Sequence, residues 1–487
     1  MFESTKKTRT GLTLYLLLTF GLTVYKPSFW SDDYAALVTP KDMSLALFGD
    51  LRPIWASTTF LSFGLIPEEV VSPLLRTLAI FSLYLIYSST LDLVSPERRE
   101  AKVYILLLTI FTLPSISIIV HWNIFWQNGY AIWFSILSLR SFIHSSGRFP
   151  IYKSAILFSI AFLTYPPSAF TVLGIFAVLV KYKLIGQQIT WKSIFKFLSL
   201  LTFTSIMSIY FAKLIIRLMD FEKNERVQFI TLQELPDKLI FIFKVIVLPF
   251  NLFGVTHPTN TSNLIIVFSS LVLFLLSFSS FYMSQNIFTS HENNMKSTFL
   301  ALCSLMPLLA TVDNQFEYRT LAGISIFVTY VTLEVALFVV KQLPALPLVD
   351  KVLSVVNFNS KYLAIHVLIV ISALCNVRYF NFFYYQYNAS KSFITSAMSE
   401  CEKNRYMDNI VLIPIDDIEY TKRIGTYSMT TDLVSGWVPI PATKYFLEIS
   451  ENQKLNIAWH DRHIESKTSC QINLNLVKSQ IEYKWIW

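Results

Sequence analysis

Two neighbouring carboxylates, Asp32 and Asp33, and one arginine, Arg52, are the side chains of this sequence with the clearest chemical potential. Adjacent carboxylates in a partly dry site repel each other, which favours proton uptake by one of them near neutral pH. A guanidinium binds a phosphate through two parallel hydrogen bonds. The acidic residues also suit the N-cap of a helix beginning at Tyr34. The pattern indicates either a proton acceptor near a phosphate site or a helix cap.

Other polar clusters are expected on the same side of the molecule. Lys213 and Arg217 lie four residues apart near the end of an apolar run, where they either snorkel to a bilayer surface or hold a lipid phosphate. Arg319 is a further candidate for the phosphate. Aromatic and amide or carboxylate side chains together can stack on a sugar ring and bind its hydroxyls, although tryptophans also populate membrane interfaces. The sugar-binding candidates are Trp122, Asn123, Trp126, Gln127 and Glu317.

Several reaction classes have no support in the sequence. There is no Walker-type loop, His-x-x-x-His pair, Cys-x-x-Cys pair or Gly-x-Ser-x-Gly turn, which leaves nucleotide-driven transport, zinc proteolysis and serine hydrolysis without a motif. Two aspartates could hold a divalent ion, but no third or fourth oxygen ligand is evident, so we favour a reaction without a metal and expect no cofactor.

The composition places these residues in a membrane protein. Of the 487 residues, 53% are hydrophobic and 15% are charged, whereas soluble domains average about 25% charged residues. The mean hydropathy is +0.50. The net charge of +8 comes from Lys and Arg residues that stand singly between apolar runs, which marks membrane topology rather than a nucleic-acid surface.

The apolar runs predict a mainly α, polytopic helical bundle. A spanning helix needs about 20 apolar residues. The eleven candidate spans are 11–25, 73–94, 103–120, 125–144, 153–166, 167–181, 197–217, 262–283, 298–312, 320–340 and 362–377. The runs 153–166 and 167–181 meet at Tyr165-Pro166-Pro167-Ser168 and are either two half-length helices joined by a recessed turn or one kinked span.

The distribution of basic residues predicts the orientation. A cytoplasmic N-terminus places most short-loop Lys and Arg residues inside, and an odd number of spans then places the tail outside. The predicted inside residues include Lys6, Lys7, Arg9, Arg98, Arg99, Lys102, Arg148, Lys153, Lys181, Lys183, Lys192, Lys196 and Lys296. We therefore expect a membrane module over 1–377 and a small extramembrane α+β domain over 378–487, with a strand at 409–415. Cys401 and Cys470 would share an oxidising compartment that permits a disulfide.

A retained first helix, then Ser31-Asp32-Asp33, then Gly49-Asp50-Leu51-Arg52-Pro53, resembles the phage-borne, serotype-converting O-antigen glucosyltransferases of the type II Gtr family. These are membrane glycosyltransferases of the GT-C class. The likeness extends over the hydropathy profile, the Arg319 segment and the tail. Where the family pattern has Gln after the mid-chain Tyr, this chain has Pro166, so no role is transferred to that turn.

The resemblance implies an inverting transfer of glucose from undecaprenyl-phosphate glucose to a sugar hydroxyl of lipid-linked O-antigen, on the periplasmic face of a bacterial inner membrane. Partner membrane proteins would make and flip the donor. Asp33, with Asp32 beside it, would accept the hydroxyl proton, while Arg52 and Arg319 would stabilise the leaving phosphate.

Two other classes of function compete with this interpretation. A lipid-linked glycan flippase or transporter should show internal repeats, and the sequence has none that we detect. An O-antigen polymerase or ligase should carry its working residues in a large, late outside loop, whereas here the strongest cluster comes first.

Overall fold

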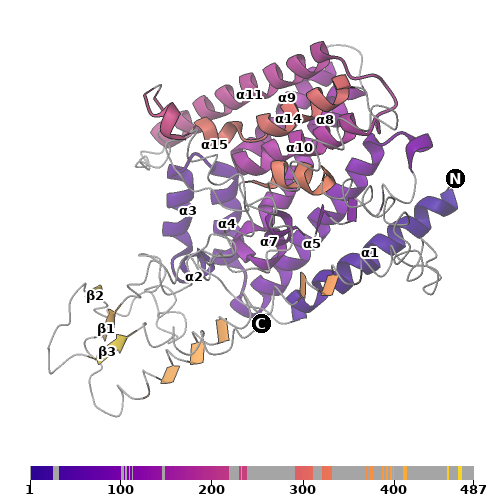
Figure 1. Ribbon diagram of the computed structural model, residues 1–487. Coiled ribbons are helices and arrows are strands. Elements are labelled where there is room, and N and C mark those ends of the chain that lie inside the picture. The colour runs from indigo at the N-terminus through magenta and orange to yellow at the C-terminus, as the bar shows by residue number, and fades with distance from the viewer. Residues whose placement is uncertain are drawn as a thin grey trace, which may run out of the picture.

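The structure is a computed structural model in which most of the N-terminal part of the chain is described (Figure 1). The described residues are 2–25, 32–99, 104, 107–108, 110–111, 113–144, 149–218, 230–231, 233–238, 291–310, 321–331, 369, 372–373, 375–376, 387–388, 391–392, 395–396, 399, 410–413, 458–459 and 470–473.

The described part of the chain is mainly helical, as the sequence predicts. Its helices are α1 (Phe2–Tyr25), α2 (Asp32–Val38), α3 (Pro40–Gly49), α4 (Pro53–Leu65), α5 (Glu68–Leu93), η1 (Pro96–Arg98), α7 (Pro114–His121), η2 (Asn123–Phe125), α8 (Trp126–Ile143), α9 (Phe149–Thr164), α10 (Pro166–Lys181), α11 (Trp191–Leu218), α14 (His291–Cys303), α15 (Met306–Ala310) and a further helix, Ala322–Val331. Proline occupies the first turn of α3, α4, α7 and α10, where its missing N–H costs no helical hydrogen bond.

Three short strands are described in the C-terminal part. They are β1 (Ile410–Ile413), β2 (Ala458–Trp459) and β3 (Cys470–Asn473), which form a parallel sheet in the order β2-β1-β3. β1 confirms the strand predicted at 409–415. Cys401 and most of the rest of 378–487 lie outside the described residues, so the predicted disulfide and the α+β domain stay predictions.

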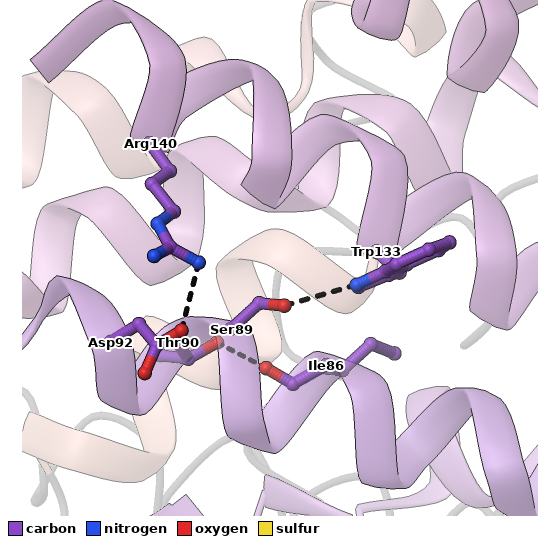
Figure 2. A network of polar contacts seen from close by, with 6 residues as sticks. All are labelled: Ile86, Ser89, Thr90, Asp92, Trp133 and Arg140. Carbon is purple, nitrogen blue, oxygen red and sulfur yellow. Dashed lines mark hydrogen bonds and ion pairs between the residues drawn. The ribbon is translucent and has the colours of Figure 1, made fainter. Parts of the chain in front are cut away.

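Helices α5 and α8 are parallel neighbours that contact each other along their length. Near the end of α5, Arg140 of α8 forms an ion pair with Asp92 at 2.8 Å, and the Trp133 indole donates to Ser89 at 3.0 Å (Figure 2). Ser72, near the start of α5, contacts Asn123 just before α8 begins. Both helices therefore run in the same direction, as the predicted order of spans requires.

Helices α9 and α10 form an antiparallel pair rather than one kinked helix. Tyr165 separates them with extended backbone (φ −157°, ψ 107°). Phe158 and Phe162 of α9 pack against Phe170 of α10, with ring centroids 5.4 and 6.4 Å apart. Such contacts across the turn require the chain to double back, so 153–166 and 167–181 are two helices.

The connections at one end of the helical group are tied together by hydrogen bonds. The Ser95 N–H donates to the Leu184 carbonyl at 2.8 Å, Gln187 donates to the Ile143 carbonyl at 2.9 Å, and the Lys296 ammonium donates to the Ile189 carbonyl at 2.8 Å. We call this the basic end, because basic residues of the predicted inside segments lie in or next to these connections and helix ends. Among the described residues these are Arg98, Arg99, Lys181, Lys183, Lys192 and Lys296.

Helices α5 and α11 extend from the basic end to the opposite end. α11 begins with Trp191, which packs on Phe299 of α14, and its other end packs Ile216 beside Leu51. By length and composition, α5 and α11 are the two described helices that could cross a bilayer; Phe149–Thr164, Pro166–Lys181 and Ala322–Val331 are apolar but shorter. Figure 1 shows α1 and α11 on opposite sides of the central helices α8, α9, α10 and α14.

The closest backbone approach among the described glycines joins α10 to Ala322–Val331. A Cβ placed on Gly174 would lie 2.0 Å from the carbonyl oxygen of Gly323. The absence of a side chain at Gly174 therefore allows these two helices to touch through their backbones, whereas a Cβ on Gly323 would meet the Ser304 side chain, just after α14, at 2.6 Å.

Candidate functional site

Asp33 lies at the end of the helical group opposite the basic end, and its side chain is completely buried. One carboxylate oxygen accepts a hydrogen bond from the Asn123 side-chain amide at 3.0 Å, and the other accepts one from the Ile124 backbone N–H at 2.8 Å. The carboxylate therefore fixes η2 against α2. The side chain of the neighbouring Asp32 lies outside the described residues.

Asn123 joins Asp33 to a buried arginine that the sequence analysis did not select. The Asn123 amide oxygen accepts hydrogen bonds from Arg76 Nε at 3.1 Å and from the Ser72 hydroxyl at 3.0 Å. Arg76 also donates to the Thr23 carbonyl of α1 and, at 3.3 Å, to the His121 carbonyl. A basic residue inside the apolar run 73–94 is the signal that would have identified it, because charges within such runs are costly and need partners.

The backbone of Ile124 connects this buried network to α4. Its N–H binds Asp33, and its carbonyl accepts a hydrogen bond from the Trp55 indole at 3.0 Å. The Trp55 ring meets the edges of Phe125 and Tyr165, with both centroid distances 5.1 Å. These contacts bring α4, η2 and the α9–α10 turn together, and we call Asp33, Ile124, Trp55, Tyr165 and Arg52 the site end.

Arg52 is held at the site end by two aromatic rings. Its guanidinium carbon lies 5.2 Å from the centroid of the Trp55 ring and 5.0 Å from that of Tyr165. The side chain is 29% exposed, and one of its nitrogens lies 3.8 Å from an oxygen of Asp50. Two cation–π contacts orient the guanidinium while leaving part of it open to a ligand.

A strained turn between α3 and α4 sets the position of Arg52. The Leu51 N–H donates to the Phe48 carbonyl and the Arg52 N–H to the Leu47 carbonyl, which is the hydrogen-bond pattern of a Schellman C-cap. The left-handed position of this motif usually holds glycine, but here it holds Leu51, with φ of 61°. Non-glycine residues in this conformation cost about 1–2 kcal/mol, and such strain concentrates at functional sites.

Packing against α9 and α11 offsets the strain at Leu51. Its side chain is 7% exposed and contacts Leu163, Ala212 and Ile216. Lys213 and Arg217 each follow one of these α11 residues, so the predicted basic pair lies on the helix segment that packs beside Leu51. Lys213 is half-buried and Arg217 is exposed.

Three of the predicted sugar-binding residues are buried among the helices. Trp122, Asn123 and Gln127 are each no more than 3% exposed, and Trp122 packs its ring 4.2 Å from that of Phe125. They pack within η2 and at the start of α8, and direct sugar contact by these three residues stays a prediction. Trp126 is half-buried and keeps that prediction. Glu317 and Arg319 lie outside the described residues.

Within the described part of the chain, no group of three or more His, Cys, Asp or Glu side chains comes together as a metal site would require. The charged groups of the site end are instead the buried, hydrogen-bonded carboxylate of Asp33 and the partly exposed guanidinium of Arg52. Such an arrangement can bind a phosphate and transfer a proton.

Neither the protein-family models, nor the curated proteins, nor the solved structures contain a match to this chain.

Proposed function

We propose that this chain is a polytopic GT-C-type glycosyltransferase of the bacterial inner membrane. In this proposal it transfers glucose from undecaprenyl-phosphate glucose to a sugar hydroxyl of lipid-linked O-antigen on the periplasmic side. The observation that carries the proposal is Arg52, held by Trp55 and Tyr165 with part of its guanidinium open. The identity of the donor and acceptor rests on the resemblance to type II Gtr enzymes.

Exposed apolar helix faces support a membrane location. α11 carries a row of large apolar side chains along its outer face, and α1 has a similar row; water would disfavour both surfaces, whereas lipid would not. Those of α11 are Phe195, Phe203, Ile206, Met207, Tyr210, Phe211, Leu214 and Leu218, and those of α1 are Leu14, Leu17, Leu18 and Leu22. At 26 and 28 residues, α5 and α11 would be about 39 and 42 Å long, enough to cross the roughly 30 Å hydrocarbon layer.

The two ends of the helical group support the proposed orientation. Basic residues gather at the end where Ser95 binds Leu184 and Lys296 binds Ile189, which suits the cytoplasmic face. The site end lies at the other termini of α5 and α11 and would therefore face the periplasm. The N-terminus is then cytoplasmic and the 378–487 domain periplasmic.

The start of α4 adds to the anion-binding character of Arg52. Arg52 is the N-cap residue of α4, and no side chain caps the first turn of this 13-residue helix. The positive end of the helix dipole and the guanidinium are therefore next to each other. A polyprenyl phosphate bound here would have its lipid chain beside the apolar face of α11.

The proposed chemistry is an in-line displacement at the anomeric carbon. The acceptor hydroxyl oxygen bonds to C1 of glucose, the C1–O bond to phosphate breaks, and its electron pair passes to the phosphate oxygen. Arg52 stabilises the charge that gathers on the departing phosphate, assisted in the proposal by Arg319, Lys213 and Arg217. A carboxylate between α1 and α4 takes the hydroxyl proton; the sequence predicts Asp33 or Asp32 for this role.

The first test compares the sugar composition of lipopolysaccharide from cells with and without the gene. Added glucose supports the proposal. An altered length of the O-antigen chains with unchanged sugar composition would instead indicate a polymerase or ligase. If neither composition nor chain length changes in a strain that supplies the donor, the enzyme assignment is contradicted and a flippase becomes the better explanation.

A second test uses purified protein in vesicles with undecaprenyl-phosphate glucose and lipid-linked O-antigen. Arg52→Gln should lower glucose transfer at least tenfold, because the guanidinium would no longer stabilise the phosphate. Lys41→Gln, which removes an exposed charge from the adjacent helix α3, is the matched control and should leave transfer unchanged.

A further inference from the structure

Three consecutive contacts connect Asp33 to Arg52. The Asp33 carboxylate accepts a hydrogen bond from the Ile124 backbone N–H at 2.8 Å, and the Ile124 carbonyl accepts one from the Trp55 indole at 3.0 Å. The guanidinium carbon of Arg52 then lies 5.2 Å from the centroid of the Trp55 ring. Asp33, Ile124 and Trp55 are each no more than 2% exposed, so both hydrogen bonds are made in the packed interior, where they are stronger than in water.

The Asp33 carboxylate is fully engaged with the protein. Its second oxygen accepts a hydrogen bond from the Asn123 amide at 3.0 Å, and Asn123 in turn binds the buried guanidinium of Arg76. The negative charge of Asp33 is thus balanced within the helical group. A sugar hydroxyl would have to displace one of these donors and enter a completely buried place before Asp33 could take its proton. These contacts suit a group that holds its neighbours in position.

Arg52 lies between the aromatic rings and a carboxylate. One guanidinium nitrogen is 3.8 Å from Oδ2 of Asp50, and Oδ1 of Asp50 is a buried atom with no hydrogen-bond partner among the described residues. Close guanidinium–carboxylate pairs have nitrogen–oxygen distances of about 2.7–2.9 Å and often use both oxygens. If Trp55 shifted, Arg52 could close on Asp50, and a guanidinium paired in that way is less able to bind a phosphate. The position of the Trp55 ring therefore keeps Arg52 available.

We infer that Asp33 is a positioning residue, which directs Arg52 toward the lipid phosphate through Ile124 and Trp55, and that it does not take the proton of the acceptor hydroxyl. This inference rests on the proposed function. No bond to Asp33 forms or breaks during the transfer. Its carboxylate keeps η2, and with it the indole of Trp55, where Arg52 requires them.

An exchange of two side chains separates positioning from proton transfer. Asp33→Asn leaves one acceptor oxygen for two donors, so either Asn123 or Ile124 loses its partner. When Asn123→Asp is added, the amide at position 33 donates to the carboxylate at position 123 and keeps the Ile124 N–H. That carboxylate still accepts from Arg76 and Ser72, as the Asn123 oxygen does in the wild type. The exchanged pair therefore retains these contacts but has no carboxylate at position 33.

The experiment measures the Kd of purified protein for undecaprenyl phosphate in detergent, and kcat and donor KM for glucose transfer in vesicles. We expect Asp33→Asn to raise Kd and donor KM about 2- to 30-fold, the range of one cation–π contact. Its kcat should fall less than about tenfold, short of the roughly 10²–10⁴-fold loss of a proton acceptor. The exchanged pair should return all three values to near those of the wild type.

Two further variants complete the set. Trp55→Phe keeps an aromatic ring but lacks the indole N–H, so its Kd should rise as that of Asp33→Asn does. Asp42→Asn, at an exposed aspartate of α3, is the matched control and should behave as wild type. Thermal unfolding in detergent gives the folded fraction of each variant, so that every value refers to folded molecules.

Several outcomes would overturn the inference alone. One is an Asp33→Asn protein with a lowered unfolding temperature but a wild-type Kd, because Asp33 would then serve stability only. Another is a folded exchanged pair whose kcat stays about 10²–10⁴-fold below wild type, as loss of a proton acceptor predicts. Should Asp33→Asn not fold, a wild-type Kd for Trp55→Phe would overturn the inference, and a raised Kd would support it.

The proposed function fails in a different way. A wild-type protein that binds undecaprenyl phosphate but transfers no glucose would overturn the proposed reaction, while the ratio of the Kd values would still decide whether Asp33 directs Arg52. A wild-type protein that neither binds the lipid phosphate nor transfers glucose would overturn both.

Discussion

The guanidinium carbon of Arg52 lies 5.0 Å from the centroid of the Tyr165 ring. Arg52 precedes α4 and Tyr165 joins α9 to α10, so this contact connects two distant segments of the chain. Tyr165 is 3% exposed, and its ring also meets Trp55 edge-on. The direction of the arginine therefore depends on a helix-to-helix turn that contributes no charge of its own.

Replacing Tyr165 separates the role of its ring from that of its hydroxyl. Tyr165→Phe keeps the face over which Arg52 lies and should leave donor KM within about twofold of wild type. Tyr165→Ala removes a cation–π contact of about 0.5–2 kcal/mol, so donor KM should rise about 2- to 30-fold. Steady-state transfer assays over a range of donor concentrations provide the check; equal KM values for the two variants would contradict a role for the ring.

Replacing Arg52 by lysine tests its planar shape. Arg52→Lys keeps the positive charge but loses the fork that binds phosphate through two hydrogen bonds and stacks on aromatic rings. We expect a donor KM about tenfold higher, which corresponds to about 1.4 kcal/mol. Arg98→Lys, at an exposed position of the basic end, is the control. A wild-type KM for Arg52→Lys would show that only the charge matters.

The buried network around Asn123 should contribute strongly to stability. Asn123→Leu would leave an Asp33 oxygen, Arg76 Nε and the Ser72 hydroxyl without their partner, and we expect a loss of about 3 kcal/mol in the free energy of unfolding. Ser72→Ala should cost only about 1 kcal/mol, because Arg76 still binds the Asn123 oxygen. Unfolding in mixed micelles measures both losses, and the predicted order is the result to check.

The contact between Gly174 and Gly323 leaves no room for a side chain. Gly174→Val should lower the unfolding temperature by several degrees or prevent folding, because the new Cβ would lie within bonding distance of the Gly323 carbonyl oxygen. Gly21→Val in α1 is the control, since a Cβ there meets nothing within 4 Å. Equal melting temperatures for the two variants would show that the helices can move apart freely.

The contacts in Figure 2 should differ in importance although they lie close together. Asp92→Asn removes an ion pair whose side chains are 46% and 45% exposed, so its effect on the free energy of unfolding should be under 1 kcal/mol. Trp133→Phe leaves Ser89 without its indole donor in a more buried position and should cost about 1–2 kcal/mol. Measuring both variants at low and high salt distinguishes them, since only the ion pair is screened.

Much of the helical order follows from the sequence, because apolar runs and prolines are local signals. Runs 73–94, 125–144 and 197–217 correspond to α5, α8 and α11, and the Tyr165-Pro166 step marks a helix boundary. The sequence also selects Asp33 and Arg52. Whether the pair at 153–181 forms one helix or two depends on contacts between Phe158 and Phe170, which spacing alone does not determine.

The sequence carries one further signal, the charge of Arg76 inside the apolar run 73–94, but the rest of the candidate site depends on contacts between residues that are distant in the sequence. The ring of Tyr165 holds the guanidinium of Arg52, and Arg76 donates hydrogen bonds to Thr23 and Asn123. Each of these contacts joins residues that are far apart in the sequence. Asp50 appears in the sequence as part of a motif, but its unpaired oxygen is a property of the folded turn. The residue types of Trp122 and Asn123 predict sugar contact, but their burial becomes known only from the fold.

The left-handed backbone at Leu51 connects the end of α11 with Asp50 and Arg52. Leu51 holds this conformation while its side chain stays against Ala212 and Ile216, and the adjoining residues are Asp50 and Arg52. If the end of α11 tilts away, the turn is released toward an ordinary backbone geometry and the carboxylate–guanidinium spacing changes with it. In the proposed membrane enzyme, lipid thickness or a neighbouring protein that shifts this helix would thereby change the rate of transfer.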